Sequence, residues 1–233
     1  MIKKFLVNRL PFLGNYKRLL FAMKDSFFVR ETYSQHQEDL FIYEFLKRYN
    51  LAKSIYVDIG ANHPTDISNT YLLYKNGFTG VVIEPNQELI RLFKLFRKKD
   101  IALCIGCSDK TGIMPFYVSK TPVLSTFQQE REVDINTHQV YYVPIMKLDD
   151  ALSNIPFVFI NLLSIDVEGI NYEVLLGGQK TIEKSLLICI EYDKAEEKEK
   201  YVEVLGSYFE LIKEFGCNLL FVNTVLSQKL IKK

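Results

Sequence analysis

Hydrophobic residues at positions 54–86 follow the pattern of a strand, a turn, a helix and a second strand. Two short apolar runs, 55–57 and 81–83, have the length of buried strands, and each is followed directly by an acid, Asp58 or Glu84. Ligands of open α/β sheets bind beyond the carboxyl ends of the strands. The pattern therefore predicts that both acids face a bound ligand.

The same alternation of strands and helices continues along the rest of the chain. Amphipathic or capped segments predict helices over residues 33–48, 68–77, 87–99, 171–183 and 195–215. Apolar runs predict strands over residues 101–107, 113–118, 157–165, 186–190 and 217–225. This order predicts an α/β fold with a mainly parallel sheet and helices on both faces, and with the strands 101–107 and 113–118 paired as a hairpin beside it.

Local patterns refine three of these elements. Ser34 followed by Gln37 predicts a capping box at the start of the first helix. The basic residues within 91–99 are expected to form the solvated face of their helix. The strand 157–165 is the most apolar of the chain, and this predicts a position at the centre of the sheet.

Two regions depart from the alternating pattern. Residues 1–32 read as a basic arm and residues 33–233 as a single domain. Residues 1–30 hold seven Lys or Arg and one Asp, a net charge of +6 (7 − 1), interleaved with Phe and Leu. Two interpretations stay open: a helical arm packed on the domain, or an arm that binds a membrane surface or a partner.

Residues 119–147 lack periodicity and are expected to form a long loop over a substrate site.

The composition narrows the classes of partner and compartment. A net charge of +1 over 233 residues gives no general affinity for nucleic acid. No apolar run reaches the roughly 18 residues of a transmembrane helix. Cys104 and Cys107 form a CxxC pair without further zinc ligands at suitable spacing, so we expect buried strand thiols in a reducing compartment. A cytoplasmic protein is therefore expected, with the basic arm as its route to peripheral contact with the inner membrane face.

The turn after the first strand indicates which cofactor binds. It contains a single glycine, Gly60, where a dinucleotide site has three, and the chain has no Walker A loop. S-adenosylmethionine has no phosphate and carries cationic sulfonium and amino groups, so acids at the ends of two strands suit it better. Glu84 can accept both ribose hydroxyls, Asp58 can face the cationic end, and Gly60 lets the backbone approach the ligand. The alternative is that Asp58 and Glu84 only cap neighbouring turns.

At this point an ordered set of motifs resembles the FkbM family of S-adenosylmethionine-dependent methyltransferases. The motifs are SQHQEDL at 34–40, VDIGAN at 57–62, SNTYLLY at 68–74, GFTGVVIEPN at 77–86, SDKTG at 108–112 and LSIDVEG at 163–169. The resemblance covers residues 33–192. It implies a Rossmann-like class I methyltransferase fold and transfer of a methyl group to a hydroxyl of a sugar, glycan or secondary metabolite.

The resemblance also implies a set of cofactor-binding residues. They are Gln35, Asp58, Gly60, Asn62, Asn69, Glu84, Asn86 and Ser108. Within this set, residues 58–62 would hold the amino-acid end of the cofactor and residues 84–86 the ribose. Gln35 would form a lid, and Ser108 would lie where adenine is usually met. His63 departs from the family pattern and is expected to pack the turn.

Transfer to a hydroxyl needs a group that removes a proton, or a metal ion that activates the oxygen. Asp166 and Glu168 follow the predicted central strand and are the catalytic candidates; strand alternation would point them the same way. Asp166 could act as the base, bind the cofactor amino group or ligate a metal such as Mg²⁺, whereas Glu168 could instead cap the next helix. His138 is an alternative base. The strand 186–190 also ends on an acid, Glu191, to which no role is assigned.

Two other classes of function stay open. One is a catalytically silent domain that keeps the fold and the cofactor. The other is an NAD-linked or nucleotide-sugar enzyme on a related fold. The sequence names neither the acceptor nor the oligomeric state.

Overall fold

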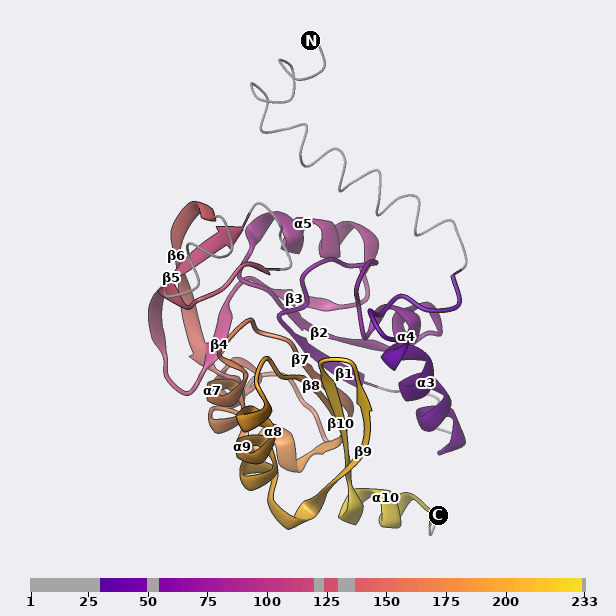
Figure 1. The fold of residues 1–233 in the computed structure, drawn as a ribbon. Helices are drawn as coiled ribbons and strands as arrows, with labels where there is room; N and C mark the ends of the chain where they lie inside the picture. The colour runs from indigo at the N-terminus through magenta and orange to yellow at the C-terminus, as the bar shows by residue number, and fades with distance from the viewer. Residues whose placement is uncertain (1–29, 50–54, 120–123, 130–136, 232–233) are drawn as a thin grey trace.

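A seven-stranded sheet forms the centre of the computed structural model, which describes residues 30–49, 55–119, 124–129 and 137–231 (Figure 1). Its strand order is β3-β2-β1-β7-β8-β10-β9. The strands are β1 (Ile55–Ile59), β2 (Thr79–Ile83), β3 (Ile101–Leu103), β7 (Ile160–Ile165), β8 (Ser185–Glu191), β9 (Phe209–Phe215) and β10 (Asn218–Asn223). Strand β10 is antiparallel to both neighbours, and the other pairings in this sheet are parallel. The predicted mainly parallel α/β sheet is confirmed, with β7 at its centre.

Helices pack on both faces of this sheet, as predicted (Figure 1). They are α3 (Glu38–Arg48), α4 (Tyr71–Lys75), α5 (Gln87–Phe96), α6 (Leu148–Ala151), α7 (Asn171–Leu176), α8 (Gln179–Glu183), α9 (Ala195–Leu205) and α10 (Thr224–Ile231), with a 3₁₀ turn η3 (Gly206–Tyr208). Alternate strand residues enter two separate cores. Val57 packs in the core that contains Val174 of α7, whereas Tyr56 packs in the core that contains Ile42 of α3 and Phe93 of α5.

A second, three-stranded sheet lies beside the first and has the order β4-β6-β5. Its strands are β4 (Gly106–Ser108), β5 (Gly112–Ser119) and β6 (Thr137–Lys147). The predicted strand 101–107 is therefore split between two sheets, and the predicted hairpin is wrong because β6 separates β4 from β5. The prediction of one long loop over 119–147 is also wrong. In β6 the buried Val143 alternates with the exposed Tyr142, a strand pattern hidden by the neighbouring prolines and polar residues.

The C-terminal third differs from the prediction at two points, both marked by glycine. The helix predicted over 171–183 is two helices, which Gly177 separates where its Cα lies against the carbonyl oxygen of Ser108. The helix predicted over 195–215 ends at Leu205, and Gly206 follows with a φ of 60°. Strand β9 then forms an exposed edge of the sheet, so its charged residues have no apolar alternation to reveal a strand.

The first described segment is pinned by an acid rather than by a capping box. Helix α3 begins at Glu38 and has no side-chain cap, so the predicted Ser34–Gln37 box is wrong. Instead, the buried carboxylate of Asp39 accepts hydrogen bonds from the Thr32 hydroxyl (2.6 Å), the Tyr33 backbone N–H (2.7 Å) and the Ser34 hydroxyl (2.8 Å). This ties residues 32–34 to the start of α3.

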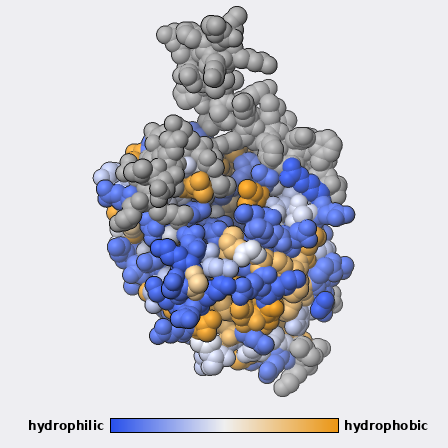
Figure 2. Space-filling view, viewed as in Figure 1, coloured by the Kyte–Doolittle hydropathy of each residue, from blue (hydrophilic) through white to orange (hydrophobic). Residues whose placement is uncertain are grey.

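The predicted basic arm lies almost entirely outside the described residues, so both interpretations of it stay predictions. Within the described ranges, no helix combines the length and the apolar character needed to cross a membrane. All four cysteines are free thiols: Cys107 and Cys189 are buried, as expected for strand thiols, Cys217 is half-buried, and Cys104 is exposed, contrary to the prediction. The face of the molecule seen in Figure 2 is mostly hydrophilic, with apolar residues in separate patches.

Candidate active site

A cavity of about 230 Å³ opens beyond the carboxyl ends of β1, β2, β7 and β8, where an α/β sheet is expected to bind its ligand. Six residues proposed from the sequence line it: Gln35, Gly60, Asn62, Glu84, Asp166 and Glu168. Eight others complete the lining: Ile67, Pro85, Phe116, Leu124, Ser125, Phe127, Val167 and Glu191. Asp58, Asn69, Asn86 and Ser108 are not among the lining residues.

Gly60 lies where three strand ends meet. Its backbone N–H donates to the carbonyl of Ile83 at the end of β2 (2.9 Å), and the N–H of Asp166 donates to the carbonyl of Ile59 (2.9 Å). Gly60 has a φ of 73°, and a Cβ placed on it would lie 1.8 Å from the carbonyl oxygen of Asp166. Only glycine fits this position, so its presence is required for the loops after β1 and β7 to meet at the floor of the cavity.

Glu84 lies at the end of β2 and is oriented by the backbone. One carboxylate oxygen accepts a hydrogen bond from the N–H of Asn62 (3.0 Å) and the other accepts one from the N–H of Asn86 (2.8 Å). Burial raises the pKa of Glu84 to about 7, although both hydrogen bonds act to lower it. Each carboxylate oxygen keeps a further lone pair for a ligand hydroxyl.

Asn62 and Asn86 therefore contribute to this site mainly through their backbone N–H groups, which hold Glu84. Asn62 has a φ of 46°, which turns its N–H toward Glu84. The side-chain oxygen of Asn86 accepts a hydrogen bond from the N–H of Glu88 (3.0 Å) and caps α5. The structure thus places the IEPN motif so that Glu84 faces the cavity and Asn86 secures the helix behind it.

Asp58 lies behind the cavity wall, in a buried polar cluster. Its carboxylate accepts a hydrogen bond from the Thr70 hydroxyl, which in turn accepts one from Arg97 (2.9 Å). Arg97 is fully buried, donates to the Tyr56 hydroxyl (2.8 Å) and forms an ion pair with Asp100 (2.7 Å). The prediction that Arg97 belongs to a solvated basic face is wrong. Burial raises the pKa of Asp58, opposed by the positive charge of Arg97.

We expect Arg97→Met to destabilise the protein by about 3–5 kcal/mol, because it leaves two buried carboxyl groups without their cation. The free energy of unfolding in urea measures this loss. Arg91→Met is the matched control, since Arg91 lies on the exposed face of the same helix and its replacement should cost within about 0.5 kcal/mol. Equal stability of the two variants would contradict a role for the cluster in holding the fold.

Three further residues highlighted by the sequence pack away from the cavity. The side-chain amide of Asn69 donates to the Ser164 hydroxyl (3.4 Å), beneath the sheet end. Ser108 lies in β4 and donates to Asp109 (3.1 Å). His63 accepts at Nδ1 hydrogen bonds from the N–H groups of Thr65 (3.3 Å) and Asp66 (3.2 Å). The expectation that His63 packs the turn is confirmed.

Three further carboxylates line the same cavity as Glu84. Oxygens of Asp166, Glu168 and Glu191 lie within 4.8 Å of one another. Burial and the neighbouring charge of Glu191 raise the pKa of Asp166 strongly, and burial also raises the pKa of Glu191, while its hydrogen bond from Asp166 acts to lower it. Both shifts have the direction expected of two neighbouring carboxyls that hold a single proton between them.

Sequence reasoning assigned no role to Glu191, although the rule that selected Glu84 also applies to it. It is the last residue of β8, a strand buried along its other positions. The thiol of Cys217 donates to its carboxylate (3.4 Å). The N-cap position of α7 is occupied by Ile170, which makes no side-chain capping hydrogen bond. The alternative base, His138, lies in β6, and its side chain is outside the described part of the chain.

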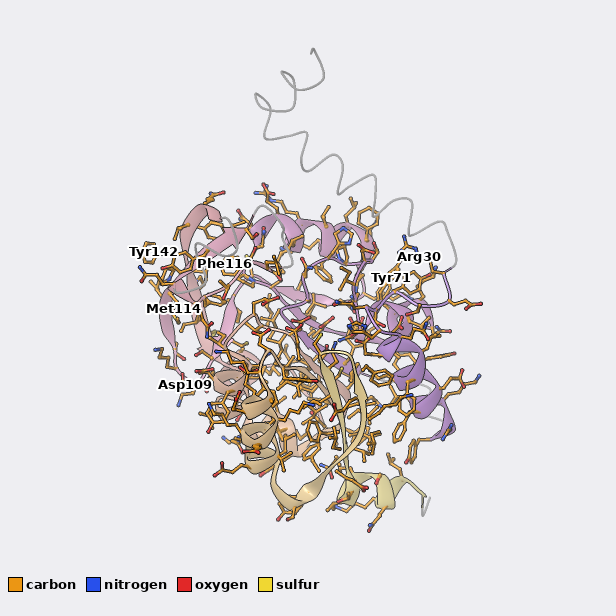
Figure 3. All side chains as sticks on the ribbon, in the orientation of Figure 1. Arg30, Tyr71, Asp109, Met114, Phe116 and Tyr142 are labelled. Atoms are coloured by element: carbon orange, nitrogen blue, oxygen red, sulfur yellow. The ribbon has the colours of Figure 1, made fainter. Side chains whose placement is uncertain are left out.

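The remaining wall is apolar and comes from the second sheet and the segment that follows it. Phe116 of β5 packs against Phe127 with ring centroids 4.9 Å apart, and Leu124 adjoins them in the cavity lining. Figure 3 shows Phe116 on the inner side of this sheet and Tyr142 on its outer side. The expectation that residues within 119–147 cover the site holds for these described residues.

Strand order and site together define the class of protein. A parallel sheet with one antiparallel strand beside its edge, and an acid-lined cavity without a phosphate-binding loop, are the features of a class I methyltransferase. Residues 58–219 match the model of a family described as the methyltransferase FkbM domain. Because the match spans more than half of the chain, this protein belongs to the FkbM methyltransferase family, which implies S-adenosylmethionine as methyl donor.

Several solved structures share the general arrangement at low sequence identity. They include the METTL16 methyltransferase domain (8% identity, TM-score 0.45, 79% of this chain and 65% of that one) and a putative O-methyltransferase from Klebsiella pneumoniae (9%, 0.45, 96% of each). A precorrin-6y C5,15-methyltransferase from Geobacter metallireducens GS-15 is similar at 11% identity (TM-score 0.42, 85% and 92%). The chain thus spans about two thirds of the METTL16 domain. A comparison with curated protein sequences gives no match.

Proposed function

We propose that this methyltransferase acts on oxygen, transferring a methyl group to a hydroxyl of a sugar, glycan or secondary metabolite. One observation carries the proposal. A single cavity joins a backbone-oriented carboxylate suited to a ribose, Glu84, to two neighbouring carboxyls with raised pKa values that suit a hydroxyl acceptor, Asp166 and Glu191.

The residues present fit the cofactor that the family implies. Four carboxylates and no Lys or Arg occur among the described lining residues, and this suits a ligand with cationic groups and no phosphate. Glu84 would hold the ribose hydroxyls, while the loop at Gly60 and Asn62 would hold the amino-acid end. Gln35 would close the rim. Asp58, Asn69 and Asn86 would support these contacts from behind, and the position of Ser108 gives it no contact with the cavity.

The bound cofactor supplies a methyl group already activated on a sulfonium. The chain's own residues must then align the acceptor oxygen and remove its proton. We assign the proton to the carboxylate of Glu191, with the Asp166 hydroxyl donating to that carboxylate and holding it in place. Phe116, Leu124 and Phe127 exclude water from the opposite side. Mg²⁺ forms no part of the proposal.

Titration calorimetry with S-adenosylhomocysteine tests the cofactor half of the proposal. We expect binding to weaken as the pH falls below about 7, approaching tenfold per pH unit, because ribose hydroxyls donate to the ionised form of Glu84. In the absence of ligand the sign is opposite: the raised pKa favours the folded state below pH 4.5, and this contribution is lost as the pH rises through 7. Glu84→Gln should weaken binding about 10- to 100-fold and remove the pH dependence.

Glu88→Gln is the control for that variant, since Glu88 is an exposed acid in the first turn of α5 and does not line the cavity. Thermal unfolding establishes that each variant is folded before its affinity is compared. Tight binding of NAD in the same calorimeter would favour a dinucleotide enzyme instead. Binding of S-adenosylhomocysteine without methyl transfer to any member of a saccharide and metabolite panel would favour a catalytically silent domain.

A further inference from the structure

Six described residues, 124–129, form a short strap across the apolar side of the cavity. Leu124, Ser125 and Phe127 line the cavity. Thr126 lies between them, is 1% exposed, and directs its side chain to the loop that carries the catalytic candidates. The strap thus contacts both the acceptor space and the residues proposed to act on the acceptor.

Two hydrogen bonds join the strap to consecutive carbonyls of that loop. The Thr126 hydroxyl donates to the carbonyl of Glu168 (2.6 Å), and the side-chain amide of Gln128 donates to the carbonyl of Gly169 (2.6 Å). The same hydroxyl accepts from the N–H of Gln128 (3.1 Å). Gly169 has a φ of 91°, which favours glycine, and a Cβ there would lie 2.4 Å from the Gln128 side chain and displace it from its present contact.

The strap is itself held by the second sheet. Thr126 and Tyr117 exchange a pair of backbone hydrogen bonds of 3.1 and 2.9 Å. The first half of the catalytic loop is held differently: the N–H of Asp166 donates to β1, and that of Val167 donates to the Asn171 side chain (2.7 Å). The loop therefore has two independent supports, with Asp166 on the main sheet and Glu168 on the strap.

We infer that Thr126 and Gln128 are positioning residues for the acceptor side of the reaction. Their hydrogen bonds hold the backbone carbonyls of Glu168 and Gly169. In this way they fix the position of the Glu168 carboxylate relative to the apolar residues of the strap. Glu84 and Gly60 have no part in this support, so cofactor binding does not depend on it. The inference rests on the proposed function for its catalytic consequence, whereas the mechanical link can be measured without any methyl acceptor.

Thr126→Val tests the link, because valine keeps the shape of threonine and removes the hydroxyl. Amide hydrogen exchange over residues 166–170 should accelerate about tenfold, while exchange over 58–62 stays unchanged. The affinity for S-adenosylhomocysteine should stay within about twofold. Once a methyl acceptor is identified, its KM should rise about fivefold or more in this variant, while the KM for the cofactor stays unchanged. Thr126→Ser should restore all three quantities.

Ser185→Ala is the matched control, since Ser185 is fully buried and donates to the Thr181 carbonyl (2.8 Å) at the opposite end of β8. It should leave exchange over 166–170 unchanged. Unchanged exchange in Thr126→Val, or an equal loss of cofactor affinity, would overturn the inference. If the wild-type protein methylates no acceptor, the O-methyltransferase proposal fails, and the exchange result still decides whether the strap positions the loop.

Discussion

Gly60→Ala is expected to abolish measurable binding of S-adenosylhomocysteine and to lower the free energy of unfolding by about 3–5 kcal/mol. The new Cβ would lie 1.8 Å from the carbonyl oxygen of Asp166, so the loops after β1 and β7 must move apart. That movement displaces the cavity floor and the hydrogen bonds from Gly60 and Asp166 to the strand ends. Calorimetry measures the affinity, and urea unfolding measures the stability.

Gly77→Ala separates backbone strain from steric overlap. Gly77 also has a positive φ, 90°, but a Cβ there would meet no atom within 4 Å. We expect this variant to lose only about 1 kcal/mol of stability and to bind the cofactor product as the wild type does. Wild-type affinity in Gly60→Ala would show that the junction of the two loops does not form the cofactor site.

Asp166→Asn is expected to reduce kcat about 10²- to 10⁴-fold while changing the affinity for S-adenosylhomocysteine only a few-fold. Asparagine still donates a hydrogen bond to Glu191, so the geometry of the pair survives. The amide is a weaker donor than the Asp166 hydroxyl and has no proton to exchange with Glu191, so the pair can no longer accommodate the proton taken from the acceptor. Transfer of a labelled methyl group at saturating substrates measures the loss.

The pH dependence and a second variant test this assignment. Burial raises the pKa of both carboxyls, so wild-type activity should fall on the acid side as the pair takes up its second proton. The hydrogen bond from Asp166 lowers the pKa of Glu191, so the weaker amide donor in Asp166→Asn should move that limb to higher pH. Glu191→Gln should cost as much as Asp166→Asn, and the double variant little more, since the two groups act as a unit. Additive losses would contradict a shared proton. Glu88→Gln, which changes an exposed acid outside the cavity lining, is the control.

The sequence identified the cavity-lining acids well because most of them follow the strands directly. Glu84, Asp166 and Glu168 all line the cavity where strand order brings their strand ends together. Asp58 does not, because β1 extends to Ile59 rather than ending at Val57. Asp58 is therefore a strand residue on the same face as Tyr56, and side chains on that face point to the helix-covered core. The sequence pattern ended this strand two residues too early, and for that reason Asp58 was predicted to face the ligand.

The burial of Arg97 could not be predicted from the local sequence pattern. Arg97 belongs to a run of basic residues with helical spacing, and nothing in that run distinguishes it from Lys94 or Lys98. Asp100 lies three positions on, but the other partners, Tyr56, Thr70 and Asp58, are 27 to 41 positions away in sequence, on other elements. Strand β9 was missed for a related reason, since a charged edge strand gains its stability from pairing with β10 rather than from its own burial.

The side-chain amide of Asn218 donates to the carboxylate of Glu38 (2.8 Å) across 180 positions of sequence. Glu38 in turn accepts from the N–H of His36 (2.8 Å), the residue after the cavity-lining Gln35. The first residue of β10 therefore helps to hold the rim of the site at Gln35. Closing a loop of this length has an entropic cost that the contact must offset. A nascent chain that has not yet reached β10 lacks this contact, so the rim at Gln35 is secured only after β10 has been synthesised.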